Sequence, residues 1–208
     1  MSTLLQINSS VFSTGGQSSQ LADHYVAIWK KANPTGKVVL RDLGANPIPH
    51  LGGETVGAYF TPADQRSDAQ KAAIALSDEL VAEIQAADTV VIGAPMYNFG
   101  LPTQLKAWAD RILVAGKTFK YGPDGVPFGL VPAGKKVYVA STRGGLYGPG
   151  SPAAALEHQE SHLTAMLSFI GLTDITIFNA DGQAIPDLKA QSIAAAEAAI
   201  AQRAVELA

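Results

Sequence analysis

Short apolar runs alternate along the chain with longer amphipathic segments, a pattern typical of repeated β-α-β units. The clearest run is Thr89–Ala94, where three consecutive β-branched residues indicate a strand buried on both faces. Four other strands are predicted at Leu4–Asn8, Lys37–Asp42, Lys136–Ala140 and Ile175–Asn179.

The segments between these strands carry apolar residues at a helical period, which predicts that they are helices. The predicted helices are Ser18–Ala32, Asp64–Ala86, Pro102–Ala115, Pro152–Ile170 and Asp187–Leu207. Two segments are predicted to be irregular: Asn46–Thr61, which is rich in Gly and Pro, and Gly116–Ala133, which carries Phe119, Tyr121 and Phe128. Five strands with intervening helices favour a flavodoxin-like, doubly wound parallel α/β sheet of order 2-1-3-4-5, with helices on both faces. Without a linker or repeat, residues 1–208 are expected to form a single domain.

Composition narrows the possible functions. Hydrophobic residues make up 47% of the chain, and the net charge is only −3, without the basic stripe of a nucleic-acid-binding protein. There is no run of Lys and Arg that would attract an anionic membrane. The absence of Cys excludes disulfides and thiolate chemistry. With no signal-like N-terminus and no apolar stretch of spanning length, we expect a cytoplasmic protein.

In this topology, ligands bind beyond the carboxyl ends of the strands, at the switch point between the first and third strands. The loop after the first strand, residues 9–19, is rich in hydroxyls and glycines and leads into a helix. Such a loop offers N–H and O–H donors to a phosphate. It has neither the lysine of a P-loop nor a G-x-G-x-x-G motif. A neutral cradle of this kind suits one monophosphate, such as that of FMN, although a polar turn with a helix cap has the same composition.

The loops after the third and fourth strands are expected to lie beside this cradle. Residues 95–100 place a thioether, two aromatic rings and an amide at a strand-to-helix turn, which suits a flat heterocycle. Residues 141–148 contain a glycine pair that permits close approach of a ligand, and Arg143 could offset negative charge. Read separately, these loops could be a core plug and a glycine turn with a surface arginine. Together they predict a phosphate at one end of a crevice and a flat ring at the other.

Several segments match, in order, those of one enzyme family. They are Arg41-Asp42-Leu43, Asn46-Pro47-Ile48-Pro49, Ala94–Phe99, Thr103–Lys106, Ala115-Gly116 with Thr118-Phe119, Gly134-Lys135-Lys136, Arg143-Gly144-Gly145 and Phe169-Ile170-Gly171. By these segments the chain closely resembles the FMN-dependent NADH:quinone oxidoreductases, also called azoreductases, over nearly its whole length.

The resemblance implies a homodimer with two flavin sites at the subunit interface, and two-electron transfer from NADH or NADPH to quinones and azo compounds. The implied cofactor residues are Ser10, Gly16, Gln17 and Ser18 for the phosphate and ribityl end, Met96, Tyr97, Asn98 and Phe99 for the isoalloxazine, and Thr142, Arg143, Gly144 and Gly145 to complete the cradle. Phe119 would overhang the flavin of the partner subunit. Tyr59 and Met166 would lie near the acceptor pocket, and no metal site is implied.

The family usually has Ser at the positions of Gly16 and Thr142. Since a Ser hydroxyl can donate to the phosphate, we expect Gly16→Ser to tighten FMN binding by about one order of magnitude. A positive φ at Gly16, or another hydroxyl that already fills the vacancy, would cancel this gain.

Other functions are less favoured by the sequence. A flavodoxin-like electron carrier is the main alternative, but such carriers are shorter and more acidic and lack the Gly116–Ala133 excursion. A phosphoacceptor domain needs clustered acidic residues where this chain has Asn8-Ser9 and Ala94-Pro95. His158 and His162, four residues apart, could bind a metal on one helical face, but the H-E-x-x-H motif is absent. Trp29 and Trp108 are interpreted as packing residues, with Trp108 at a dimer interface as the alternative.

Overall fold

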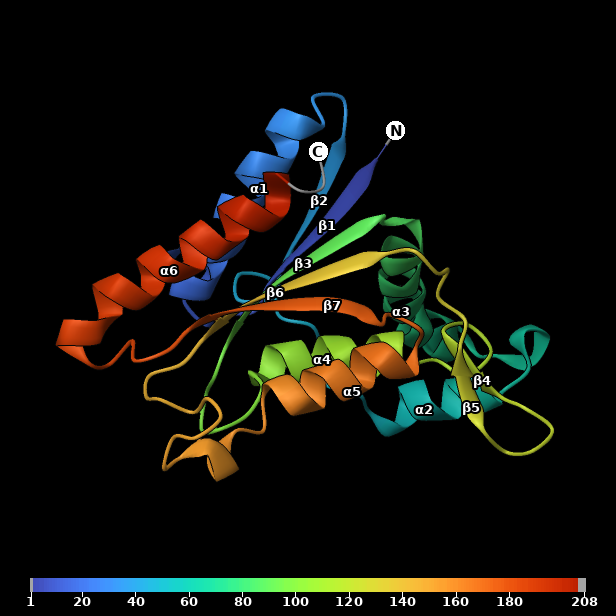
Figure 1. Ribbon diagram of the computed structural model, residues 1–208. Helices are drawn as coiled ribbons and strands as arrows, with labels where there is room; N and C mark the ends of the chain where they lie inside the picture. The colour runs from blue at the N-terminus through green and yellow to red at the C-terminus, as the bar shows by residue number, and fades with distance from the viewer. Residues whose placement is uncertain (1, 206–208) are drawn as a thin grey trace.

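The computed structural model of the protein describes residues 2–205. Five parallel strands form one sheet: β1 (Thr3–Asn8), β2 (Lys37–Asp42), β3 (Thr89–Pro95), β6 (Lys136–Thr142) and β7 (Asp174–Ala180). Their order is β2-β1-β3-β6-β7 (Figure 1). Because β6 and β7 are the fourth and fifth strands of this sheet, the predicted order 2-1-3-4-5 is confirmed.

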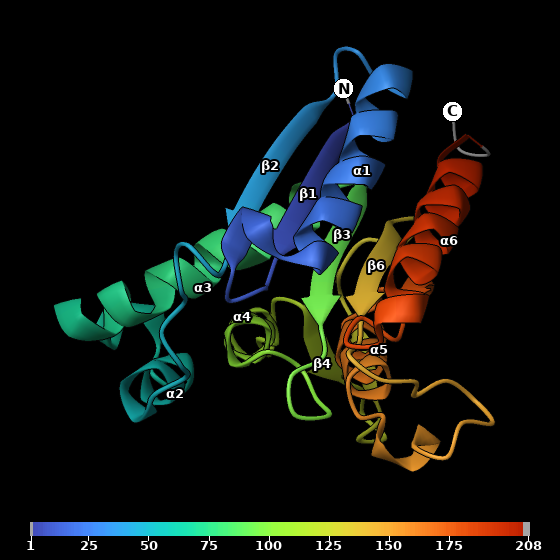
Figure 2. The same cartoon turned by 90° about the vertical axis from the view of Figure 1, so that its left-hand side faces the viewer.

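Helices cover both faces of the sheet. Figures 1 and 2 show α1 (Gln17–Ala32) and α6 (Pro186–Val205) on one face, and α3 (Asp68–Ala86), α4 (Thr103–Ile112) and α5 (Glu160–Phe169) on the other. Each face has its own apolar core. Among the described residues, no helix combines the length and the hydropathy needed to cross a membrane. Leu207, the last residue of the predicted C-terminal helix, lies outside the described residues.

Two elements lie where the sequence predicted irregular structure. Helix α2 (Gly53–Phe60) forms despite two glycines, because Thr55 and Ala58 are buried where the helix packs beside α3. The aromatic excursion contains an antiparallel hairpin of β4 (Phe119–Tyr121) and β5 (Pro127–Gly129). Strands of three residues are too short to produce a readable alternation of polar and apolar positions.

Two predicted helices begin later than expected. The helix predicted from Asp64 starts instead at Asp68, after a 3-10 turn at Ala63–Gln65, because Ser67 and Gln70 form a reciprocal capping box. The segment predicted as one helix over Pro152–Ile170 is a short 3-10 turn at Ala154–Leu156 followed by α5. The Glu157 carboxylate accepts hydrogen bonds from the amides of the two residues that precede and open α5.

Trp108 is completely buried within the core, so its alternative assignment to a dimer interface is wrong. Trp29 is also buried and belongs to the apolar face of α1. The histidine pair is separated by the late start of α5: His158 precedes the helix and His162 lies within it. In the part of the chain that the structure describes, no group of three or more His, Cys, Asp or Glu residues is placed to hold a metal ion.

Strand β3 lies at the centre of the sheet, and every residue in it is buried. Gly93, near its carboxyl end, has the start of α1 directly against it. A Cβ at Gly93 would lie 2.8 Å from the carbonyl oxygen of Ser18, and real Cβ atoms do not approach backbone so closely. Because Gly93 has no side chain, the N-terminus of α1 can pack directly against the carboxyl end of β3.

We expect Gly93→Ala to lower the free energy of unfolding by about 1–3 kcal/mol, because the added methyl must displace backbone of α1. Gly57→Ala is the matched control, since the space around that helical glycine is open and Ala favours a helix by up to about 1 kcal/mol. Urea denaturation followed by circular dichroism measures both. A Gly93→Ala protein as stable as the wild type would mean that the packing of α1 on β3 is not tight.

Candidate functional site

The loops after β1, β3 and β6 enclose a cavity of about 270 Å³ at the carboxyl edge of the sheet. Its lining residues are Ser10, Phe12, Gly16, Gln17, Pro95, Met96, Tyr97, Thr142, Arg143, Gly144 and Gln183. Most of the cofactor residues expected from the sequence are thus brought together. Of the others, Ser18 is buried in the first turn of α1, Asn98 and Phe99 form the adjoining turn, and Gly145 follows the lining segment.

One end of the cavity is the N-terminus of α1. Gly16 occupies the N-cap position, and no side chain caps the helix. Ser18 and Ser19 are fully buried, yet neither hydroxyl has a hydrogen-bond partner among residues 2–205. Buried polar groups are normally paired, and helix N-termini attract anions. A phosphate bound here would supply the acceptors that these hydroxyls and the first amides of the helix lack, so the residues fit a phosphate group.

Hydrogen bonds fix the loop after β1 in place. The Ser9 hydroxyl donates to the carbonyl of Gly93 at 2.7 Å. Ser13 has a left-handed backbone, with φ of 52°, and its hydroxyl donates to the carboxylate of Asp42, which also accepts from the amides of Gly44 and Ala45. Ser13 is therefore committed to supporting the loop.

Ser10 joins the first loop to the second. Its Oγ lies 3.2 Å from the Tyr97 hydroxyl and accepts a hydrogen bond from the amide of Phe12. The Tyr97 hydroxyl also accepts from the amide of Val11. The third loop is tied in by the Met96 amide, which donates to the carbonyl of Thr142 at 2.8 Å.

The family usually has Ser at the position of Gly16, but the structure leaves no free space there for a side chain. Its φ of −72° and ψ of 139° are open to any residue, so backbone strain is not the obstacle. A Cβ on Gly16 would instead lie 2.2 Å from Ser10 Oγ and 2.4 Å from Ser10 Cβ. The expected simple gain from Gly16→Ser thus conflicts with the packing of Ser10, which fills the place of the missing side chain.

The turn after β3 is strained. Tyr97 and Gly100 each donate a backbone hydrogen bond to the other, at 3.1 Å, and both central residues have positive φ, 48° at Asn98 and 70° at Phe99. This is the two-residue hairpin turn that prefers Gly at its second central position. A side chain in the left-handed region costs on the order of 1–3 kcal/mol, and such residues cluster at functional sites. The turn presents Phe99, which is half-exposed, beside the cavity.

Arg143 is not a surface arginine, since it is only 3% exposed. Its Nε donates to Asp181 at 2.6 Å, and its Nη1 lies 3.2 Å from a carboxylate oxygen of Glu160. Its positive charge is therefore already matched within the protein and is not free for a ligand. Burial raises the pKa of Glu160, and the neighbouring guanidinium partly opposes that shift.

Gln183 is a cavity residue that the sequence reasoning missed. It lies in the loop after β7, and the switch-point rule drew attention only to the loops after the first, third and fourth strands. Its Nε2 donates to Ser192, whereas its buried Oε1 accepts no hydrogen bond from any residue that the structure describes. Such an acceptor would suit a hydroxyl of a ribityl chain.

The three residues expected near the acceptor are not brought together. Tyr59 and Phe119 line a second cavity of about 410 Å³, with apolar walls from α2 and from the segment that follows α4. Phe119 also packs against Phe169, with ring centroids 4.6 Å apart. Met166 lies in the apolar core and does not line this cavity.

We expect Gly16→Ser to lower the free energy of unfolding by about 1–3 kcal/mol and to weaken FMN binding, because the new Cβ overlaps Ser10. The double variant Ser10→Gly with Gly16→Ser regains that space and should be more stable than the sum of the single changes. Urea denaturation and fluorescence titration with FMN measure these effects. Tighter FMN binding by the single variant would refute the steric explanation.

Comparisons with known proteins agree with this fold. A family model described as flavodoxin-like fold matches residues 2–204. The chain is 50% identical over 202 residues to an FMN-dependent NADH:quinone oxidoreductase of Burkholderia pseudomallei, covering 97% of this chain and 99% of that protein. A counterpart from Cellvibrio japonicus is 49% identical and covers 88% of each chain.

Solved structures give the same result. The azoreductase AzrA superposes with a TM-score of 0.90 at 30% identity, covering 99% of this chain and 100% of the other. An FMN-dependent NADH-azoreductase from Bacillus anthracis, solved in complex with FMN, has a TM-score of 0.90 at 25% identity and covers both chains completely. With half of its residues shared over almost its full length, the chain belongs to the family of FMN-dependent NADH:quinone oxidoreductases.

Proposed function

We propose that this chain is an FMN-dependent oxidoreductase that passes two electrons from NADH or NADPH to quinones and reductively cleaves azo compounds. The observation that carries the proposal is the cavity at the switch point, with an uncapped helix N-terminus at one end and a strained aromatic turn at the other. The relatives' names give the cofactor, the donor and the acceptors. Since NADH is a cytoplasmic metabolite, we propose that the enzyme acts in the cytoplasm.

The cavity has donors for one phosphate and few for a second. The α1 amides and the hydroxyls of Ser18 and Ser19 would hold that phosphate. Among its lining residues the only cation is Arg143, which is engaged with two carboxylates. These properties favour FMN over a dinucleotide flavin.

Bound FMN would supply a two-electron redox centre, and no protein nucleophile is required. The protein would position the rings and stabilise negative charge. The amides of Gly144 and Gly145 donate to no group in the described part of the chain, so they are free to donate to the ring edge. The double hydrogen bond of the Tyr97–Gly100 turn would hold Asn98 and Phe99 rigidly against that edge.

Donor and acceptor would use the cavity in turn. Phe12, which lines the cavity, and Phe99, which lies in the adjoining turn, are exposed aromatic side chains that would offer flat apolar surfaces to a nicotinamide or a quinone. If both substrates need this one surface, the oxidised nicotinamide must leave before the acceptor binds.

We therefore expect ping-pong kinetics. Initial rates with NADH at several fixed concentrations of a soluble quinone should give parallel double-reciprocal lines, because no complex contains both substrates. Protein stripped of flavin is the control and should regain activity with added FMN. Intersecting lines would require separate donor and acceptor sites, and failure to oxidise NADH directly would favour an electron carrier.

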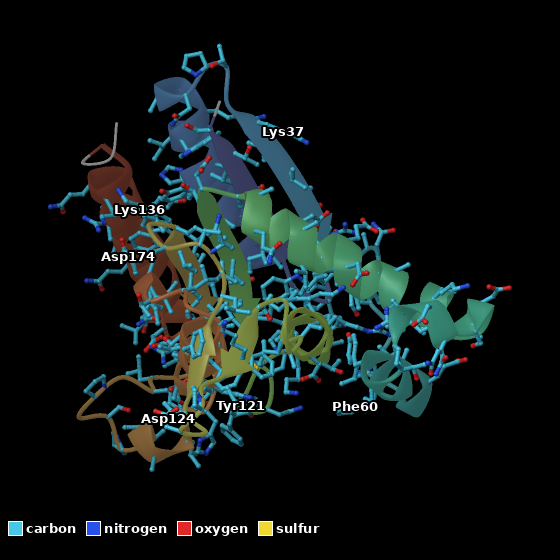
Figure 3. All side chains as sticks on the ribbon, turned by 90° about the vertical axis from the view of Figure 1, so that its right-hand side faces the viewer. Lys37, Phe60, Tyr121, Asp124, Lys136 and Asp174 are labelled. Atoms are coloured by element: carbon cyan, nitrogen blue, oxygen red, sulfur yellow. The ribbon has the colours of Figure 1, made fainter. Side chains whose placement is uncertain are left out.

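We also propose a homodimer. Phe60 at the end of α2 is 85% exposed, and Tyr121 and Phe128 of the β4–β5 hairpin are exposed too. Figure 3 shows Phe60 and Tyr121 at the same end of the molecule. Gathered apolar side chains of this kind mark interaction surfaces. They adjoin the second cavity, where a partner subunit could bring its flavin next to Phe119 and Tyr59.

Light scattering at micromolar concentration should give a mass twice that of the chain. We expect Phe60→Glu to shift the protein towards the monomer, because a charge would be buried in the interface. Leu40→Glu, which changes a half-exposed apolar residue on edge strand β2, is the control and should remain dimeric. A fully active wild-type monomer would mean that each chain completes its own site.

A further inference from the structure

The loop that connects β7 to α6 supports the Arg143–Gly145 segment along its whole length. The amides of Gln183, Ala184 and Gly182 donate to the carbonyls of Arg143, Gly144 and Gly145, at 2.9–3.0 Å. The amide of Arg143 donates in turn to the carbonyl of Ala180 at 3.1 Å. Within the described residues, the amides of Gly144 and Gly145 are the only backbone groups of this segment that have no partner.

A side-chain contact fixes the same junction. Asp181 opens the β7–α6 loop, and its carboxylate accepts from Arg143 Nε at 2.6 Å. Arg143 is nearly inaccessible to solvent, and its second carboxylate partner, Glu160, belongs to α5. Asp181 is the partner that ties the arginine to the loop beneath the glycine pair.

Charge balance alone does not account for both carboxylates around Arg143. One ionised carboxylate would balance the guanidinium, yet Asp181 and Glu160 both contact it. The second carboxylate therefore adds negative charge behind a cavity that must receive an anionic cofactor. The Asp181–Arg143 contact is therefore best explained by the position in which it holds the loop, since its charge would oppose an anionic ligand.

We propose that Asp181 is a positioning residue: through Arg143 it holds the Gly144–Gly145 amides in the orientation that receives the flavin. The inference rests on the FMN-binding function proposed above. Without the Asp181 carboxylate, Glu160 would be the only carboxylate partner of Arg143, and the direction of the glycine pair would depend on the four backbone hydrogen bonds alone. Binding of FMN would then have to order the Gly144–Gly145 segment, and the free energy that this ordering costs would weaken the affinity.

The test is titration of apoprotein with FMN, followed by flavin fluorescence. Asp181→Ala should raise the Kd for FMN about tenfold, the effect of losing one hydrogen bond to a charged group. Asp181→Asn retains an oxygen that can accept from Nε and should keep the Kd within about threefold of the wild type. Asp174→Ala, at the opposite end of β7 (Figure 3), removes the same charge from an exposed site and should leave the Kd unchanged.

A double-mutant cycle decides whether Asp181 acts through Arg143. If it does, adding Asp181→Ala to Arg143→Ala should weaken FMN binding no further. Additive effects, or a wild-type Kd for Asp181→Ala, would overturn the inference. Circular dichroism of each apoprotein separates misfolding from loss of positioning, because a misfolded variant loses helix and strand content. The Asn variant should bind FMN like the wild type at unchanged helix and strand content. Wild-type protein that bound no FMN would instead refute the proposed function.

Discussion

The approach of α1 to the end of β3 is the constraint on which the site depends. Gly93 has no side chain, so the backbone of Ser18 lies where a methyl group would be. Ser9 reinforces the same junction by donating twice, through its amide and its hydroxyl, to the carbonyl of Gly93. The result is an uncapped helix N-terminus facing the crevice between β1 and β3. Every other feature of the cavity is arranged around that fixed set of donors.

This arrangement would bind an anion through dipoles and not through a cation. Two buried hydroxyls and the first amides of an uncapped helix lack acceptors among the described residues. A phosphate bound at this helix end would supply acceptors to the folded protein only, so cofactor binding and fold stability would be linked. The strained Asn98–Phe99 turn is a second local cost at the same cavity. Strained backbone of this kind clusters at sites that hold a ligand in rigid contact.

The sequence was sufficient for the sheet and for the location of the cavity, since strand order follows from alternating apolar patterns and ligand position follows from strand order. It was insufficient where the outcome depends on contacts between distant residues. The helix at Gly53–Phe60 forms because it packs beside α3, and the hairpin strands are too short to leave a pattern. The clash at Gly16 depends on Ser10, which lies six residues earlier in the loop. The pattern of polar and apolar residues does not predict how close these two residues lie.

Arg143 shows the same limit in electrostatic terms. A glycine pair preceded by arginine suggested a cation for the ligand, but the fold surrounds that cation with Asp181 and Glu160. The cavity therefore gains no net positive charge from it, and the carboxylates leave a slight negative surplus. Affinity for an anionic cofactor must then come from oriented amides and hydroxyls, which are effective only when they are held in position. In the site as proposed, the charged residues would fix the backbone, and the neutral backbone would make the contacts.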